Sequence, residues 1–133
     1  TGILYPFLKQ AFRDNVTITG VDLSPNMVEE AHKQLPEGCK DSYVVSNLID
    51  YEPEEQVDAV ILNACFGNFW NQTAILEQAA SWTDGHVFVT HPLGASFVQR
   101  LHHEDKPTVP HTLPLEWGPL LRFLPLQWTP LQW

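Results

Sequence analysis

The sequence predicts an α/β fold, a doubly wound and mostly parallel sheet with helices on both faces. The first observation is that short apolar runs alternate with segments of helical periodicity, in the order β-α-β-β-α-β-α after an opening helix. The second is the run Val16–Asp22, which is rich in β-branched residues and ends in an acid. A helix start follows this acid at once, as expected where a strand of such a sheet leads into its helix.

Four segments have the spacing of amphipathic helices. Ile3–Arg13 repeats apolar residues at helical intervals, and Pro6 lies within its first turns, where a missing N–H is tolerated. The next helix takes Ser24 as its N-cap and Pro25 as its first residue, and it ends at Pro36. The remaining two are expected at Asn71–Trp82 and Gly94–His103.

The expected strands are short. Val16–Asp22 and Ser42–Ser46 flank the second helix. Val57–Asn63 is the most hydrophobic run and is expected to be buried. The turn Asp84-Gly85 leads into the last strand, Val87–Thr90.

Composition limits the partners. The chain has 133 residues, enough for one domain, and a net charge of −9. This charge disfavours nucleic acid and anionic membrane surfaces, so a small-molecule or protein substrate is expected. No apolar run is long enough to span a membrane. Cys39 and Cys65 make no disulfide framework, although a single bridge between them stays an alternative. Free thiols would indicate a reducing intracellular compartment, either the cytoplasm or an organelle such as the chloroplast.

The chain changes character after residue 105. We therefore assign residues 1–105 to the domain and residues 106–133 to a tail rich in Pro, Leu and Trp. Prolines interrupt any regular element there, and a degenerate repeat runs through 113–117, 124–128 and 129–133. The tail either folds back over the domain, docks on a protein partner through its tryptophans, or results from truncation or splicing.

Polar side chains follow the carboxyl ends of four predicted strands, where open α/β sheets bind their ligands. They occur at Asp22-Leu23, Asn47-Leu48, 63–69 and 91–94. An acid after the second strand of such a sheet accepts hydrogen bonds from ribose hydroxyls, and a glycine turn precedes it by about 20 residues. Gly2 lies 20 positions before Asp22, so we expect the chain to start within a cofactor-binding motif.

At these residues the chain resembles the class I S-adenosylmethionine-dependent methyltransferases, of the type 11/25-like domain. The matching pieces are Thr1-Gly2, Gly20-Val21-Asp22-Leu23-Ser24 with Met27 and Ala31, Val57-Asp58-Ala59-Val60, and Gly85. The likeness covers residues 1–114 and implies a Rossmann-like fold with S-adenosylmethionine as cofactor.

The resemblance implies an adenosine site. Asp22 would hold the ribose hydroxyls, and Leu23 and Met27 would pack beside the adenine. Asn47 stands where many members have an acid that accepts a hydrogen bond from the adenine amino group, and Leu48 would donate its N–H and cover the ring. The competing interpretations are a capping or loop acid for Asp22, an Asx turn for Asn47 and core packing for Met27.

The resemblance also implies a site for the methionine part and the methyl group. Gly2 would let the backbone approach the methionine part, and Asn63 and Ala64 would border the point of methyl transfer. If the acceptor must lose a proton, His91 is the candidate base, and its alternative is a hydrogen bond within a turn. Tyr5 either borders the methionine end or packs in the core.

The sequence departs from the family at its start. The family's first strand, which normally lies between the second and the fourth, is absent from the sequence together with most of the glycine-rich motif. We therefore expect these two strands to lack their shared neighbour and to leave backbone groups without partners.

Three function classes remain open. The first is methyl transfer to a small molecule or protein side chain, and the second is an inactive methyltransferase-like scaffold in a larger assembly. An NAD-dependent oxidoreductase is weaker, because no G-x-G-x-x-G is visible. No metal site is expected, because adjacent His102 and His103 point to different sides of a helix.

Overall fold

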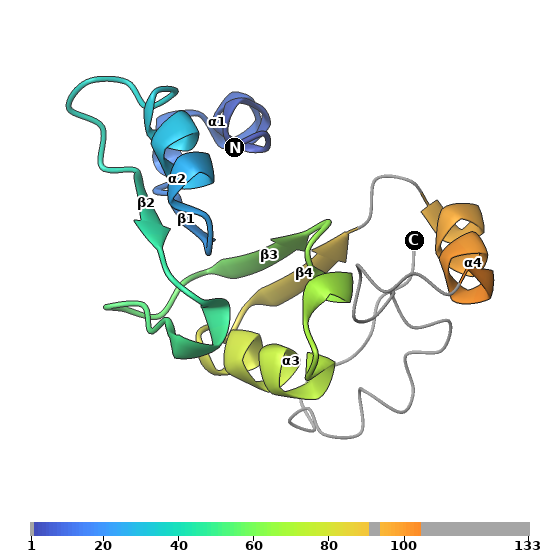
Figure 1. The fold of residues 1–133 in the computed structure, drawn as a ribbon. Coiled ribbons are helices and arrows are strands. Elements are labelled where there is room, and N and C mark those ends of the chain that lie inside the picture. The colour runs from blue at the N-terminus through green and yellow to red at the C-terminus, as the bar shows by residue number, and fades with distance from the viewer. Residues whose placement is uncertain (1, 91–93, 105–133) are drawn as a thin grey trace. The chain divides into compact units, whose positions relative to one another are not determined.

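The computed structural model describes residues 2–90 and 94–104 of the chain. His91 and the predicted tail at 106–133 lie outside the described residues. The chain divides into two compact units, Thr1–Tyr51 and the part that begins at Glu52. Within the described residues, each unit contains a pair of parallel strands and its own helices (Figure 1).

The first unit is a β-α-β arrangement preceded by a helix. Its strands β1 and β2 are parallel, and they pair from Thr19 opposite Ser42 to Asp22 opposite Val45. Helix α2 packs on both strands and buries Val28. The elements are α1 (Tyr5–Phe12), η1 (Arg13–Asn15), β1 (Thr19–Asp22), α2 (Pro25–His32), β2 (Ser42–Val45) and η2 (Leu48–Asp50).

The second unit is also a β-α-β arrangement, and here a helix follows it. Its strands β3 and β4 are parallel, and they pair from Ala59 opposite His86 to Asn63 opposite Thr90. Helix α3 connects the strands and packs against β4 (Figure 1). The elements are β3 (Ala59–Asn63), η3 (Phe66–Asn68), α3 (Gln72–Ser81), β4 (His86–Thr90) and α4 (Gly94–His103).

The predicted helices and strands are all present, in the predicted order. Ser24 caps α2 by accepting a hydrogen bond from the Met27 N–H, as predicted, although α2 ends at His32 and so falls short of Pro36. Strand β1 begins three residues later than predicted, at Thr19. It is shorter because the backbone before it has side-chain partners: the Val16 carbonyl accepts a hydrogen bond from Lys9.

Each sheet has two strands within the described residues: β1 pairs with β2, and β3 pairs with β4. The two strands for which the sequence predicts the loss of a shared neighbour are β1 and β3, and in the described residues they belong to separate sheets. Along β1, alternate residues bond to the neighbouring strand: the Ile18 and Asp22 carbonyls accept hydrogen bonds from the N–H groups of Ser42 and Ser46. The backbone groups of the residues between them face the open edge of the sheet.

The prediction that the strand at Val57–Asn63 is buried is wrong for one of its faces. Leu62 is 2% exposed and belongs to the core, whereas its neighbour Ile61 is 37% exposed. Successive side chains of a strand point to opposite faces of the sheet. Only the face that shares the core with the apolar side of α3 is buried, and the core residues of α3 are Ile75, Leu76, Ala79 and Ala80.

Gly20 is required by close packing in the first unit. It lies opposite Tyr43, and a Cβ at Gly20 would overlap the Tyr43 ring. We expect Gly20→Ala to lower the free energy of unfolding by about 1–3 kcal/mol, which is the usual effect of overpacking. Urea denaturation followed by far-UV circular dichroism measures this. The same substitution in a Tyr43→Ala background should cost clearly less, and an equal cost would contradict the overlap.

Candidate functional site

Asp22 is the last residue of β1, at the carboxyl end of the parallel pair. Its side-chain Oδ1 accepts a hydrogen bond from the Ser24 N–H at 2.9 Å, which fixes the carboxylate against the turn into α2. Its backbone carbonyl accepts from the Ser46 N–H at 3.1 Å, which places the end of β2 beside it. One carboxylate oxygen of Asp22 thus has the alternative role predicted for this residue, that of a loop acid. The other oxygen, Oδ2, has no hydrogen bond among the described residues.

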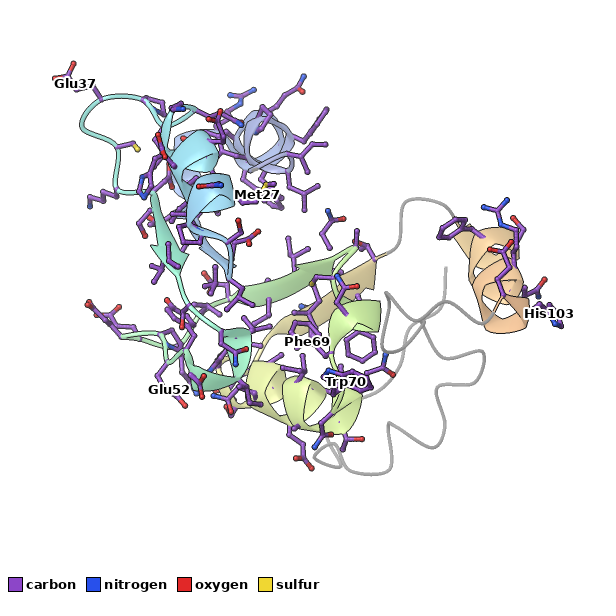
Figure 2. All side chains as sticks on the ribbon, viewed as in Figure 1. Met27, Glu37, Glu52, Phe69, Trp70 and His103 are labelled. Carbon is purple, nitrogen blue, oxygen red and sulfur yellow. The ribbon has the colours of Figure 1, made fainter. Side chains whose placement is uncertain are left out.

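Two apolar residues that follow Asp22 in the chain have side chains exposed to solvent. Leu23 is 71% exposed, and Met27, on the first turn of α2, is 41% exposed (Figure 2). The interpretation of Met27 as a core residue is therefore wrong, because the residues that α2 buries are Val28 and Ala31. An exposed pair of apolar side chains beside a carboxylate suits a ligand with a flat ring and a polar sugar.

Asn47 and Leu48 follow β2 at the same end of the sheet. Asn47 precedes the short helix η2, and its backbone carbonyl accepts a hydrogen bond from the Asp50 N–H at 3.0 Å. The Asn47 side chain makes no capping hydrogen bond, so the Asx turn proposed as its alternative role is not formed. The exposed Asn47 amide is available to a ligand, and Leu48 is half-buried beside it.

Gly2 has a backbone role within the first unit. Its φ of 63° lies in the left-handed region that favours glycine, and its carbonyl accepts a hydrogen bond from the Tyr5 N–H at 2.9 Å. A Cβ at this position would lie 2.6 Å from the Tyr43 Oη. Gly2 thus allows a close approach of the chain to Tyr43, whatever it contributes toward a ligand.

The sequence comparison decides the family. A family model described as "Methyltransferase domain" matches residues 1–84, which is more than half of the 133 residues. The chain belongs to this methyltransferase domain family. The match contains β1, β2 and β3, and therefore the strand ends at Asp22, Asn47 and Asn63.

Solved structures support the fold of this methyltransferase domain. Three of them are the plantazolicin methyltransferase BpumL, in complex with a pentazolic desmethylPZN analogue and SAH, with a triazolic analogue and SAH, and with SAH alone. Each has a TM-score of 0.61 and 16% sequence identity, and the alignment covers 80% of this chain and 41% of that chain. The predicted Rossmann-like α/β fold is confirmed. No curated protein sequence matches the chain.

In the second unit of the methyltransferase domain, a different set of polar groups lies at the carboxyl ends of the strands. The Thr90 hydroxyl donates to Asn63 Oδ1 at 2.8 Å, which fixes the amide at the carboxyl end of β3. Ala64 follows with a φ of 55°, and its N–H donates to the Thr90 carbonyl at 2.9 Å. The candidate base His91 comes directly after this pair in the sequence and lies outside the described residues.

The backbone at Ala64 is strained, because a residue with a Cβ is costly in the left-handed region. We expect Ala64→Gly to raise the free energy of unfolding of the second unit by about 0.5–1 kcal/mol, since relief of the strain exceeds the added chain entropy. The buried Trp82 provides a fluorescence signal for urea unfolding. Ala59→Gly in the extended backbone of β3 is the control and should destabilise the unit; stabilisation by both substitutions would contradict the assignment.

The sequence gives no signal for the most important polar cluster of the first unit. Asp41 is 7% exposed and precedes β2. Its carboxylate pairs with Lys9 Nζ at 2.7 Å, and it accepts hydrogen bonds from the Tyr5 hydroxyl at 2.9 Å and the Ile18 N–H at 2.8 Å. Tyr5, which could also have bordered a ligand, is therefore a core residue that links α1 to the sheet.

The pKa values of the cluster reflect its burial. Burial alone would raise the pKa of the Asp41 carboxyl, but the hydrogen bonds from Lys9, Ile18 and Tyr5 together lower it below its usual value. Burial and the adjacent Asp41 carboxylate raise the pKa of the Tyr5 hydroxyl to about 12. The cluster thus holds one ionised carboxylate and one neutral phenol at neutral pH.

The described residues of the domain offer neither a metal cluster nor a membrane-spanning helix. Residues 2–90 and 94–104 contain no group of three or more His, Cys, Asp or Glu side chains that could hold a metal ion. The helices in that part of the chain include none that is long and apolar enough to cross a membrane. Cys39 and Cys65 are not joined to each other by a disulfide.

Proposed function

We propose that this domain supplies the adenosine-binding part of an S-adenosylmethionine-dependent methyltransferase. The observation that carries the proposal is the carboxyl end of β1, where the Asp22 carboxylate is held by the Ser24 N–H and keeps Oδ2 available. The exposed Leu23 and Met27 follow it within the same unit. A carboxylate beside exposed apolar side chains matches a ribose joined to an adenine.

The residues of the first unit fit the cofactor chemically. Asp22 would accept hydrogen bonds from the ribose hydroxyls, and Leu23 and Met27 would cover one side of the adenine. The side-chain oxygen of Asn47 is a neutral acceptor for the adenine amino group. Leu48 would donate its backbone N–H to the ring. The methyltransferase BpumL, which shares the fold, is crystallised with SAH, and this supports the same choice of cofactor here.

When bound, S-adenosylmethionine supplies a methyl group on a sulfonium, and transfer of this group is an in-line displacement. The protein then mainly aligns the acceptor and excludes water. Asn63 and Ala64 would border the point of transfer, and His91 would accept a proton from an acceptor that must lose one. The acceptor is a small molecule or a protein side chain, as the desmethylPZN analogues bound to BpumL also suggest.

Isothermal titration calorimetry of the full chain tests the proposal. S-adenosylhomocysteine should bind with a 1:1 stoichiometry, and adenosine alone should retain binding, because the proposed contacts lie on the adenosine half. Homocysteine should give no heat of binding. Absence of binding by both S-adenosylhomocysteine and adenosine to the folded chain would overturn the proposal.

A second candidate is a catalytically inactive scaffold subunit of a larger assembly. It is favoured by one observation: each sheet of the described residues has two strands, which leaves one edge of β1 and one edge of β3 open to another chain. The Trp-containing tail would then be a docking arm for a protein partner. Methyl transfer by the purified monomeric chain would exclude the scaffold.

We also propose that the domain works in a reducing intracellular compartment, since two cysteines make no disulfide framework. Thiol titration of the protein isolated under conditions that prevent oxidation should find both cysteines free. A disulfide between Cys39 and Cys65 in this preparation would contradict the proposed reducing compartment.

A further inference from the structure

One face of the β3–β4 pair presents apolar side chains to solvent. Ile61 lies directly opposite Phe88 on this face, and they are 37% and 44% exposed. Ala59 and His86 form the next pair along the strands, and the His86 ring stacks on Phe88 at a centroid distance of 5.8 Å. We call the surface formed by Ala59, Ile61, His86 and Phe88 the open face of the second unit.

The open face has the character of a surface that another segment covers. Its centre is an aliphatic side chain beside an aromatic ring, and the hydrogen-bonded Asn63 and Thr90 form a polar rim at one end. The opposite face of the same strands is already covered, since Leu62 is 2% exposed. A two-stranded sheet buries little apolar area by itself, so a segment that covers the second face adds stability.

The tail at 106–133 is too apolar to remain in solvent by itself. It contains seven leucines, three tryptophans and one phenylalanine but two basic residues and one acid. Such a composition is opposite to that of a solvated linker. Its prolines disfavour a helix or sheet within the tail that could bury these side chains. The tail therefore needs an apolar surface.

We propose that the Leu/Trp repeat of the tail covers the open face of its own chain, with Trp117 or Trp128 against Phe88. Helix α4 ends at His103, so the stretch to Leu113 spans up to roughly 30 Å when extended. A segment tethered this closely competes at an effective concentration in the millimolar range, which favours it over a second copy or a separate protein. The proposal is independent of the cofactor.

Photo-crosslinking of the full chain tests the proposal. The photoreactive residue p-benzoylphenylalanine replaces Phe88, which is exposed and aromatic, so the substitution is mild. Irradiation should join position 88 to a residue between 106 and 133 of the same chain, as mass spectrometry can locate. Mixing ¹⁴N- and ¹⁵N-labelled protein distinguishes links within one chain from links between copies.

The matched control places the same probe at Glu77, an exposed position of α3, the helix that shares the core with the covered face. It should lose the link to the tail. Phe88→Gln should also speed amide hydrogen exchange in residues 106–133, whereas Glu77→Gln should leave it unchanged. Links between copies, equal linking from positions 77 and 88, or no link from position 88 to the tail would each overturn the proposal.

Discussion

Asp41→Ala is expected to lower the free energy of unfolding of the first unit by about 3 kcal/mol, the low end of the cost of breaking a buried ion pair, because the Lys9 side chain is 25% exposed. The substitution leaves the Lys9 ammonium with the Val16 carbonyl but no carboxylate, and it removes the acceptor of the Tyr5 hydroxyl and the Ile18 N–H. Amide hydrogen exchange at the buried Ala31 measures the effect, because the tryptophans of this chain begin at Trp70, outside the first unit.

Asp50→Ala is the control, because Asp50 is an exposed acid of the same unit. It should change the exchange of Ala31 little, as is usual for surface substitutions. If Asp41→Ala were as mild as Asp50→Ala, the cluster could not be what joins α1 to the sheet.

The same cluster predicts how stability depends on pH. The pKa of Asp41 is lower in the folded chain than in the unfolded chain, so its contribution is present above the unfolded pKa of about 4 and is lost as pH falls through the folded pKa. Tyr5 has its pKa raised to about 12, so its contribution is present below the unfolded pKa of about 10 and is lost as pH rises toward the folded value. Asp41→Ala should flatten the acid side of the stability profile.

Asp22→Asn is expected to weaken binding of S-adenosylhomocysteine by about 10- to 100-fold, since hydrogen bonds to a charged acceptor contribute roughly 1.5–3 kcal/mol. The fold should be unchanged, because the amide oxygen can still accept the hydrogen bond that Ser24 N–H now gives to Oδ1. Isothermal titration calorimetry provides the affinity. Glu37→Gln removes the same charge from an exposed loop and should leave the affinity unaltered (Figure 2).

The elements that depend on local signals could be predicted from the sequence. Ser24 and Pro25 define the start of α2, and Asp22 is recognisable because an acid closes an apolar strand just before that start. These residues act within a few positions of one another, so a single sequence shows them. The strand ends at which we propose the adenosine site could be predicted for the same reason, because they follow directly from where two apolar runs stop.

Interactions between distant positions could not be predicted in this way. Asp41 meets Tyr5 across 36 positions and Ile18 across 23, and nothing in a short acidic turn indicates that it will be buried. Similarly, the apolar run that contains Ile61 and Leu62 gives no sign that only one of its faces is covered. That difference depends on which helices pack on the sheet, and therefore on the whole fold.

The central claim is that the Asp22 carboxylate binds the ribose of the cofactor. A double-mutant cycle tests it most directly, with wild-type and Asp22→Asn protein titrated with S-adenosylhomocysteine and with its 2′,3′-dideoxyribose analogue. Removing the ribose hydroxyls should weaken binding to the wild type by at least about tenfold and should cost the variant little, because the two changes remove one interaction. An equal loss in both proteins, or no binding to the wild type, would contradict the claim.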